Sequence, residues 1–383
     1  MSKLRNEMPV THKWAYFDHA AVGPIPRPTA QVISHWCQQA SEEGDTVWPE
    51  WNRGVNQTRK TAARLLNADP AEIALVPNTT AGISLVADGF PWSSGDNVVT
   101  LDNEFPSNIY PWMNQADRGV EVRRVPVDPD GRVSLDRILA ACDDRTRIVS
   151  CSWIGFASGY RIDPGKFVEA VHDRGALFFL DAIQGVGVFP LDVADIPIDF
   201  LAADGHKWML GPEGAGLFYV RREHLDKLHP LGVGWYSVEH CFDFSKIELK
   251  LKPSAARYEG GTMNAVGFLA LNSSLELLER CGLSCTRSPI AERILEVTDY
   301  ACQRLESIGA ELQNIREPEH KSGIVTFRLN GRDLPAVRET CLKNGVVLSY
   351  RNGSLRISPH AYNNEAEIDH LIDILSSPGA QHD

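Results

Sequence analysis

Long apolar runs are missing from this 383-residue chain, and so is any excess of basic residues. No apolar run approaches the roughly 20 residues of a membrane-spanning helix, and the N-terminal stretch lacks the apolar core of a signal peptide. Acidic residues outnumber basic ones by 50 to 38, giving a formal net charge of −12 at pH 7. Nucleic acids and anionic membranes both bind basic patches, so we expect neither as a partner.

Cysteine is sparse, and the 8 that are present are scattered. A chain of this size needs no disulfide scaffold, so we expect reduced thiols and a cytoplasmic protein. Cys281 and Cys285 lie close together, but no histidine or second cysteine pair completes a zinc site. Two ordinary thiols are therefore the favoured interpretation, and no metal is expected. No G-x-G-x-x-G motif follows a first strand, which leaves a nicotinamide-binding α/β protein without support.

What is present is ordinary globular material, 43% hydrophobic and 23% charged, enough for one large domain and a smaller one. Its middle part alternates helix-like stretches with strand-like ones, which span residues 71–77, 96–102, 145–153, 176–181, 199–204 and 216–222. Most of these strands are apolar throughout, as is typical of a sheet covered on both faces. We therefore predict an α/β fold with a mostly parallel sheet, whose ligands bind beyond the carboxyl ends of the strands.

From about residue 265 the pattern changes. Two helical stretches lead to short strand-like runs at 323–329, 345–351 and 354–358, and a last helix covers 365–377. This pattern predicts a smaller α+β domain at the C-terminus. The predicted division is an N-terminal segment crossing the active site, a large domain and a small domain, at residues 1–30, 31–264 and 265–383.

The most informative residue is Lys207, which follows one apolar strand-like run, 26 residues after Asp181 at the end of another. Pyridoxal phosphate (PLP) needs a lysine amine for its Schiff base and a carboxylate that keeps its ring nitrogen protonated. A lysine after a strand is usually only solvated. The neighbouring His206, the upstream acid and the glycine-rich turn after the lysine together favour the cofactor.

A phosphate group needs hydrogen-bond donors and a helix N-terminus. Residues 76–86 offer a strand, a short polar turn and a helix that begins near Thr79, with Thr80 beside it. A simple helix cap is the alternative interpretation of these threonines. His206 is a second potential phosphate donor, although a lone histidine is more often a structural hydrogen bonder.

Together these motifs resemble the class V aminotransferases of PLP fold type I. That group includes cysteine desulfurases, selenocysteine lyases, kynureninases and isopenicillin N epimerase-like proteins. The runs DAIQGVG (181–187) and DGHKWMLGPEG (204–214) carry the resemblance, which extends from YFDHAAVGP to LRISPHAYNNEAEID. It implies an aspartate-aminotransferase-like large domain with a mostly parallel sheet, a smaller α+β domain, and a PLP-dependent enzyme that acts on an amino acid.

The resemblance implies a role for each matching residue. In it, Lys207 is the Schiff-base lysine, Asp181 pairs with the pyridine nitrogen and Gln184 hydrogen-bonds the phenolic oxygen of PLP. The phosphate is held by Thr79, Thr80 and His206.

The substrate carboxylate would be held by Arg356. Strand alternation places Arg356 on the face opposite to Leu355 and Ile357, and a guanidinium offers a bidentate fork to a carboxylate. Without the resemblance, a surface arginine would be the preferred interpretation.

Two further residues complete the implied site. Thr262 matches a threonine that reaches the phosphate of the neighbouring subunit, which implies a homodimer with active sites at the interface. The adjacent Gly260–Gly261 pair can also be interpreted as a domain hinge. Phe105, in an FPS context, matches the aromatic ring that stacks on the cofactor, and its alternative is an ordinary core aromatic.

Three features depart from the family pattern. Phe156 stands where many relatives carry an asparagine, and Asp204 stands where many carry a phosphate-binding hydroxyl. A carboxylate repels a phosphate, so we expect Asp204 to turn away or to bind a neighbouring donor. Residues 343–356 contain no cysteine, and Cys341 falls on a predicted helix. An enzyme-bound persulfide, as in cysteine desulfurases, is therefore doubtful.

The sequence thus predicts a PLP-dependent transferase or lyase, with transamination or C–S or C–C bond cleavage favoured. Cysteine desulfurase, selenocysteine lyase and epimerase are the alternatives. A non-catalytic binding protein of the same fold is disfavoured because Lys207, Asp181 and Arg356 are all intact. The substrate is left open.

Overall fold

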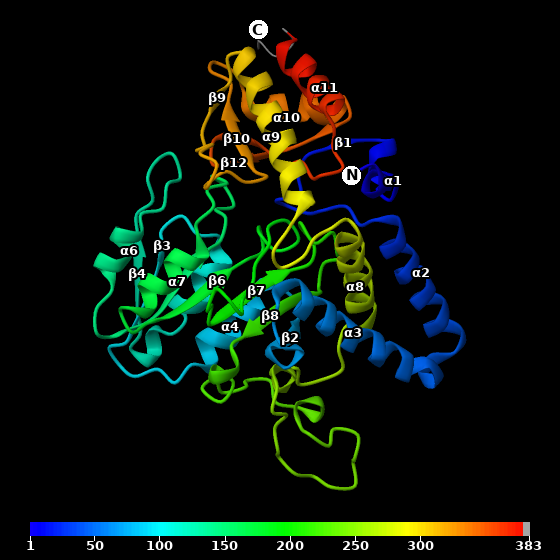
Figure 1. Cartoon of the computed structure of the whole chain (residues 1–383), viewed down its shortest axis with the longest axis vertical. Helices are drawn as coiled ribbons and strands as arrows, with labels where there is room; N and C mark the ends of the chain where they lie inside the picture. The colour runs from blue at the N-terminus through cyan, green and yellow to red at the C-terminus, as the bar shows by residue number, and fades with distance from the viewer. Residues whose placement is uncertain (378–383) are drawn as a thin grey trace.

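The computed structural model describes residues 1–377. Its centre is a seven-stranded sheet with the strand order β2-β8-β7-β6-β5-β3-β4 (Figure 1). The strands are β2 (Ile73–Val76), β3 (Asn97–Leu101), β4 (Glu121–Val125), β5 (Thr146–Ser152), β6 (Leu177–Asp181), β7 (Phe200–Asp204) and β8 (Gly216–Val220). Of these, β8 alone runs antiparallel to both neighbours, β2 and β7, and the other neighbouring pairs are parallel. The predicted mostly parallel sheet is confirmed.

Successive side chains of the central strands enter two different apolar clusters. In β6, Phe178 and Leu180 pack with helices on one face, and Phe179 packs with α4 on the other. Each of these side chains is fully buried. Continuous apolar sequence is therefore required here, because both faces of the sheet are covered. Edge strand β4, with the polar sequence EVRRV, was not predicted.

The helices vary widely in length. They are α1 (Ser2–Asn6), α2 (Arg27–Glu42), α3 (Trp48–Leu66), α4 (Thr79–Gly89), α5 (Tyr110–Met113), α6 (Leu135–Ala141), α7 (Pro164–His172), α8 (Ala265–Arg280), α9 (Pro289–Ser307), α10 (Leu334–Lys343) and α11 (Glu365–Ser376). No helix in the described part of the chain is long and apolar enough to cross a membrane.

A second, four-stranded antiparallel sheet has the order β12-β13-β10-β9. Its strands are β9 (Glu311–Leu312), β10 (Val325–Arg328), β12 (Ser349–Arg351) and β13 (Ser354–Ile357). It shares one apolar cluster with α9, α10 and α11, as the α+β prediction requires. The N-terminal β1 (Ala15–Tyr16) pairs in parallel with β11 (Val346–Val347), so the start of the chain is tied to this unit.

The packing of α8 indicates on which side of this helix the boundary between the two domains lies. Phe268, Leu271 and Leu275 of this helix belong to the same buried cluster as the large sheet, and α8 lies against α2 and α3 (Figure 1). This packing favours a boundary after α8 rather than before it. The division at residues 264 and 265 stays a prediction.

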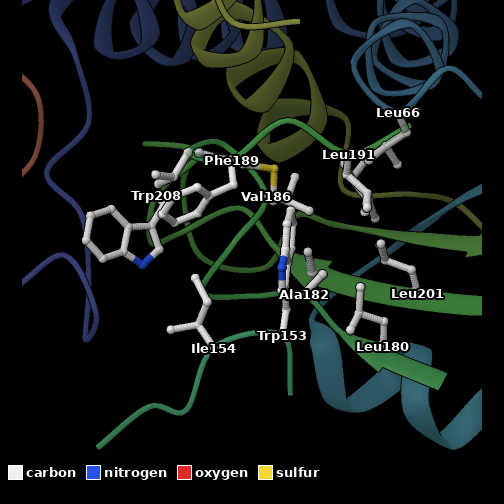
Figure 2. Close-up of a cluster of buried hydrophobic side chains, with 14 of the residues drawn as sticks. Leu66, Trp153, Ile154, Leu180, Ala182, Val186, Phe189, Leu191, Leu201 and Trp208 are labelled. Atoms are coloured by element: carbon white, nitrogen blue, oxygen red, sulfur yellow. The ribbon is translucent and has the colours of Figure 1, made fainter. Parts of the chain in front are cut away.

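The core under the predicted site is tightly packed. Figure 2 shows Trp153, Phe189 and Trp208 gathered beside the ends of the central strands. A Cβ atom added to Gly185 would lie 2.1 Å from the Trp153 ring, so this position of the DAIQGVG run admits glycine alone without movement of the ring.

Candidate active site

The carboxyl ends of four strands meet at one cavity. Ser152 and Asp181 end β5 and β6, Asp204 ends β7, and Lys207 follows three residues later. Thr79 begins α4 shortly after β2. All five residues line a cavity of about 600 Å³. This is the edge of a parallel sheet at which ligands are expected.

Eight of the nine predicted site residues line this cavity. They are Thr79, Thr80, Phe105, Asp181, Gln184, His206, Lys207 and Arg356. Thr262 does not: it is exposed and lines two other cavities, one of them about 240 Å³ in volume and rich in tryptophan. The predicted role for Thr262 lies in a partner's site, so its absence from this cavity neither supports nor opposes that role.

Lys207 is buried, with 9% of its surface exposed. Burial lowers the pKa of its amine to about 8; the Asp181 charge opposes this shift and the Arg356 charge adds to it. The Lys207 Nζ atom lies 5.8 Å from the centre of the Phe105 ring. An amine with a pKa near neutrality can exchange protons readily with a bound molecule.

Asp181 is buried almost completely and accepts a 3.2 Å hydrogen bond from the backbone N–H of Ile183. Burial raises the pKa of its carboxyl to about 6, partly opposed by that hydrogen bond and by the Lys207 charge. A buried carboxylate with one backbone donor is short of partners. It is thus suited to a cationic group entering the cavity.

Gln184 joins three parts of the chain. Its Nε2 donates to the Ala20 carbonyl at 3.0 Å, and its Oε1 accepts from Trp208 Nε1 at 2.7 Å. The N-terminal segment is therefore held against the lysine loop, and Ala20 lies in the cavity wall. One amide hydrogen of Gln184 remains for a further acceptor.

The other end of the cavity is suited to an anion. Asn78 caps α4 by accepting from the Ala81 N–H at 2.8 Å, so the first N–H groups of the helix face the cavity without helical partners. Thr80 donates to Ser107 at 2.8 Å. The Thr79 oxygen accepts from the Asp204 backbone N–H at 2.9 Å, so its own hydrogen stays available.

Asp204 lies beside a neighbouring donor, which is one of the two arrangements expected for it. Its Oδ2 lies 3.0 Å from Nδ1 of His206, within ion-pair distance although not aligned as a hydrogen bond. Both side chains line the cavity. The carboxylate therefore lies beside a neighbouring donor and orients the His206 ring.

Two aromatic rings form the wall opposite the strand ends. Phe105 is 47% exposed and meets Phe156 edge to face, with ring centres 5.3 Å apart and planes at 80°. Phe105 thus offers an accessible face to a flat ring, while Phe156 supports it and brings no polar side chain to the site.

Arg356 is buried and already engaged. Its Nη1 donates to the Phe156 carbonyl at 2.6 Å, and its Nη2 lies 3.2 Å from the Asp18 carboxylate. Asp18 also accepts from the Ser349 hydroxyl at 2.5 Å. Nε of Arg356 has no hydrogen-bond partner among the described residues. Any carboxylate that binds this guanidinium must therefore share it with Asp18.

Several lining residues were not predicted. The polar ones are Asn78, Ser107, Ser152, Arg351 and Asn352. Ser107 belongs to the FPS run and was within reach of motif reasoning. Asn78 lies in the predicted strand–turn–helix stretch and caps α4 locally, so it was also within reach. The remaining three lie at a strand end and in a hairpin, and their neighbours in the cavity are distant in sequence, so no local pattern marked them.

Behind the cavity, Glu104 is buried and takes hydrogen bonds from Ser152, whose backbone N–H lies 2.6 Å from the carboxylate. The Ser152 hydroxyl donates to the same carboxylate. Burial raises the pKa of Glu104 to about 7, and the charge of Asp181 adds to the shift. Glu104 therefore anchors the end of β5 next to Asp181.

Two buried histidines, His19 and His360, lie where the N-terminal segment, the lysine loop and the small unit meet, and together they form the histidine seam. His19 contacts the Ser358 carbonyl at 2.9 Å and the Tyr362 hydroxyl at 2.8 Å. His360 lies 3.4 Å from the Trp208 carbonyl, with its ring centre 5.2 Å from that of His19. Burial lowers the pKa of His19 well below its usual range and that of His360 to about 4.

No cysteine of the described chain lines the cavity that holds Lys207. Cys341 lies on α10, fully buried, and burial raises the pKa of its thiol to about 11. Residues 349–356 form a tight hairpin, in which Asn352 and Gly353 make the two-residue turn. Between residues 343 and 356 there is thus no long loop that could carry a thiol to the lysine.

Comparisons with known proteins agree over almost the whole chain. The family model "Aminotransferase class-V" matches residues 15–371. A probable cysteine desulfurase of Methanothermobacter thermautotrophicus is 30% identical, over 97% of this chain and 96% of that protein. An uncharacterized aminotransferase of Bacillus subtilis is 28% identical, over 92% and 91%.

Solved structures share the fold. The cystine C–S lyase C-DES, in complex with its product cysteine persulfide, superposes with a TM-score of 0.90 at 22% identity, covering 96% of this chain and 99% of that one. A cysteine desulfurase from Thermococcus onnurineus, in its apo form, gives a TM-score of 0.87 at 23% identity, covering 98% and 96%. The predicted fold is confirmed, and with the family model spanning nearly all its length, the chain belongs to the class-V aminotransferase family.

Proposed function

We propose that this protein is a PLP-dependent enzyme that acts at the α-carbon of an amino acid, as a transferase or a lyase. One observation carries the proposal: Lys207 and Asp181 are both buried in the wall of one cavity at the carboxyl edge of the sheet. An amine with a lowered pKa and an under-partnered acid are the two groups that PLP requires.

The cavity fits the cofactor at each of its other polar points. Asp181 would hold the ring nitrogen, the N-terminus of α4 with Thr79 and Thr80 would hold the phosphate, and Gln184 has one amide hydrogen left for the phenolic oxygen. Phe105 offers a ring face. When bound, PLP supplies an electron sink for the bond that breaks at the α-carbon.

Lys207 then has two tasks. Its amine would hold the cofactor, and with a substrate bound it would move a proton to or from the substrate α-carbon as general base and acid. Its pKa of about 8 leaves a neutral fraction at physiological pH. Arg356, and behind it Asp18, would orient the substrate carboxylate.

For the reaction branch, we favour C–S or C–C bond cleavage or transamination without a protein-bound persulfide. Relatives named cysteine desulfurase and a fold neighbour named cystine C–S lyase support a sulfur amino acid as substrate. A persulfide on the enzyme is opposed by the lack of a cysteine in the described cavity wall and by the burial of Cys341. An epimerase is the remaining alternative.

We further propose a cytoplasmic homodimer in which Thr262 reaches the partner's phosphate site. The tryptophan-rich cavity beside Thr262 supports an interface there, because Trp36, Trp48, Trp51 and Trp235 line it. Exposed apolar side chains in the segment 242–249 lie close to it along the chain, and Ile247 is 95% exposed. Sedimentation that shows a fully active monomer would contradict this arrangement.

The proposal is tested by trapping the cofactor on the chain. PLP is added to the parent, to Lys207→Ala and to Lys227→Ala, an exposed lysine that serves as the matched control. After borohydride reduction, mass spectrometry should find the pyridoxyl group on the parent and the control, at Lys207, and not on Lys207→Ala. Equal trapping on all three proteins would overturn the proposal.

A panel of amino acids then separates the branches. Conversion to the pyridoxamine form indicates transamination, whereas pyruvate with ammonia, sulfide or alanine identifies the lyase reactions.

A further inference from the structure

The four-stranded sheet turns one face to the helices of the small unit. Its other face lies against Asp18 and the backbone of residues 156–157, beside the cavity. Leu355 and Ile357 of β13 are buried in the apolar cluster. Arg356 points the opposite way, with Ser349 and Thr326 directly opposite it on the neighbouring strands. Directly opposed residues in antiparallel strands share a face. This second face is therefore polar.

The polar face carries three arginines. Arg351 stands opposite Ser354 in the register of β12 and β13, and Nε of Arg328 donates to the Ser354 hydroxyl at 2.9 Å. Together with Arg356, they place three guanidinium groups on one small sheet. Both Arg351 and Arg356 line the cavity that holds Lys207.

The two cavity arginines differ in their partners. Arg356 is engaged by Asp18 and by the Phe156 carbonyl. Arg351 is exposed, and its side chain makes no hydrogen bond or ion pair with any residue from 1 to 377. The charge of Arg351 nevertheless reaches Arg356, since it adds to the lowering of the Arg356 pKa.

The acids of the cavity do not balance Arg351. Asp181 faces Lys207, and Asp204 lies 3.0 Å from His206. Asp18 is held by Ser349 and Arg356. These are the acids in contact with the cavity arginines or in its wall.

A second cavity of about 340 Å³ lies on the other side of Arg351. Glu339 of α10 and Arg338 line it, as does Asp18, but neither acid forms an ion pair with Arg351 in the described chain. Arg351, at the cavity mouth, is thus left without an ion-pair partner in the described chain.

The hairpin fixes the backbone of Arg351 in a defined place. Asn352 and Gly353 have φ values of 47° and 76°, as the two-residue turn between β12 and β13 requires. A turn of this kind fixes the register, so Arg351 and Arg356 stay on the same face. Their separation cannot be adjusted by a long loop.

We propose that Arg351 binds a second anionic group on the substrate, so that the enzyme acts on amino acids whose side chains end in a carboxylate or another oxyanion. The inference rests on the proposed function, because it assigns the first anion, the α-carboxylate, to Arg356. Guanidinium groups pair bidentately with carboxylates and other oxyanions. The guanidinium of Arg351 at the cavity mouth thereby determines the substrate class without contacting the bond that breaks.

The test measures binding rather than turnover. The protein, loaded with PLP, is titrated calorimetrically with the dicarboxylates malonate, succinate, glutarate and adipate, and with monocarboxylates of matching length. One dicarboxylate should bind about 10- to 100-fold more tightly than its matched monocarboxylate, as expected for one charge-assisted contact. Without any such preference in the parent, the proposal fails.

Three variants locate the contact. Arg351→Gln should reduce the favoured dicarboxylate to the affinity of the monocarboxylate and leave the monocarboxylate unchanged. Arg351→Lys should restore part of the preference. Arg280→Gln removes the same charge from the exposed end of α8 and should change neither affinity.

Two other results overturn the inference. Equal losses for both ligand classes in Arg351→Gln would make Arg351 the anchor of the α-carboxylate, and unchanged affinities would make it a solvated surface residue. Borohydride trapping at Lys207 is scored separately on every variant. A protein that fails to trap PLP reports on the proposed function, whereas one that traps PLP and lacks the dicarboxylate preference reports on Arg351.

Discussion

The cavity has two unlike walls. The wall formed by the seven-stranded sheet is buried and internally bonded: Asp181 and Gln184 are nearly inaccessible, and Gln184 already bonds to Ala20 and Trp208. The wall formed by the small sheet is a short hairpin at the sheet edge, on which Arg351 is exposed beside the buried Arg356. The sheet wall is suited to holding one bound molecule in one orientation, whereas the hairpin wall is suited to contacting molecules that vary.

This difference separates two kinds of energetic effect. Under the proposed function, groups in the buried wall act on the reacting atoms, so their loss should lower kcat. Groups in the hairpin wall would contact the parts of a substrate that do not react, so their loss should raise KM.

The largest effect is expected for Asp181→Asn, in the buried wall. The amide cannot hold a proton on the cofactor ring, so kcat should fall by about 10²- to 10⁴-fold with PLP still bound. Asp195→Asn, on an exposed loop, is the control. Steady-state kinetics check this, and a near-normal kcat would remove Asp181 from the chemistry.

The next effect is expected for Arg356→Ala, in the hairpin wall. Loss of a carboxylate contact worth roughly 2–4 kcal/mol should raise KM by about 30- to 1000-fold. Asp18→Asn, which frees the guanidinium from its carboxylate partner, should lower KM or leave it unchanged. A drop confined to kcat in Arg356→Ala would erase the distinction between the two walls.

An intermediate effect concerns the histidine seam between the walls. Unfolded histidine takes up a proton near pH 6.5, but buried His360 does so only near pH 4. The unfolded chain therefore binds more protons between these values, and the free energy of unfolding should fall as the pH drops through them. From pH 8 to pH 5 the loss is about 2 kcal/mol for His360 alone.

Urea unfolding at the two pH values measures this loss. His360→Gln should flatten the dependence, and His35→Gln, exposed on α2, should not. A parent whose stability is the same at pH 8 and pH 5 would contradict the prediction.

The smallest effect is expected for Cys341→Ser. The thiol is buried on α10 and remote from the cavity wall, so turnover of the true substrate should stay within a few-fold of the parent. Cys302→Ser, a buried thiol in the same apolar cluster, is the matched control. If only Cys341→Ser abolishes turnover and cysteine yields alanine with an enzyme-bound persulfide, the protein is a desulfurase with a relocated nucleophile.

Sequence reasoning recovered the buried wall better than the hairpin wall, for a physical reason. Lys207 and Asp181 end apolar runs, and strands of a parallel sheet end at a common edge, so their proximity follows from local pattern. The antiparallel direction of β8 did not, because its sequence is as apolar as that of its neighbours. Direction in the sheet depends on connections rather than on composition.

The hairpin wall depends on distant partners. Asp18 meets Arg356 from 338 positions away, and no local motif marks that pairing. Whether Arg351 has an ion-pair partner likewise depends on which residues surround it in space. Strand alternation did place Arg356 correctly, opposite to Leu355 and Ile357.

The two-residue turn at Asn352 and Gly353 also limits how the chain can change by insertion or deletion. Side chains alternate along β12 and β13, so a single residue added within either strand would turn Arg351 or Arg356 into the apolar core. Length changes that preserve the site must therefore fall in the turn itself. Homologues with longer segments here are therefore expected to differ by complete loop exchange, and loop grafting between them should begin at Ser349 and end at Arg356.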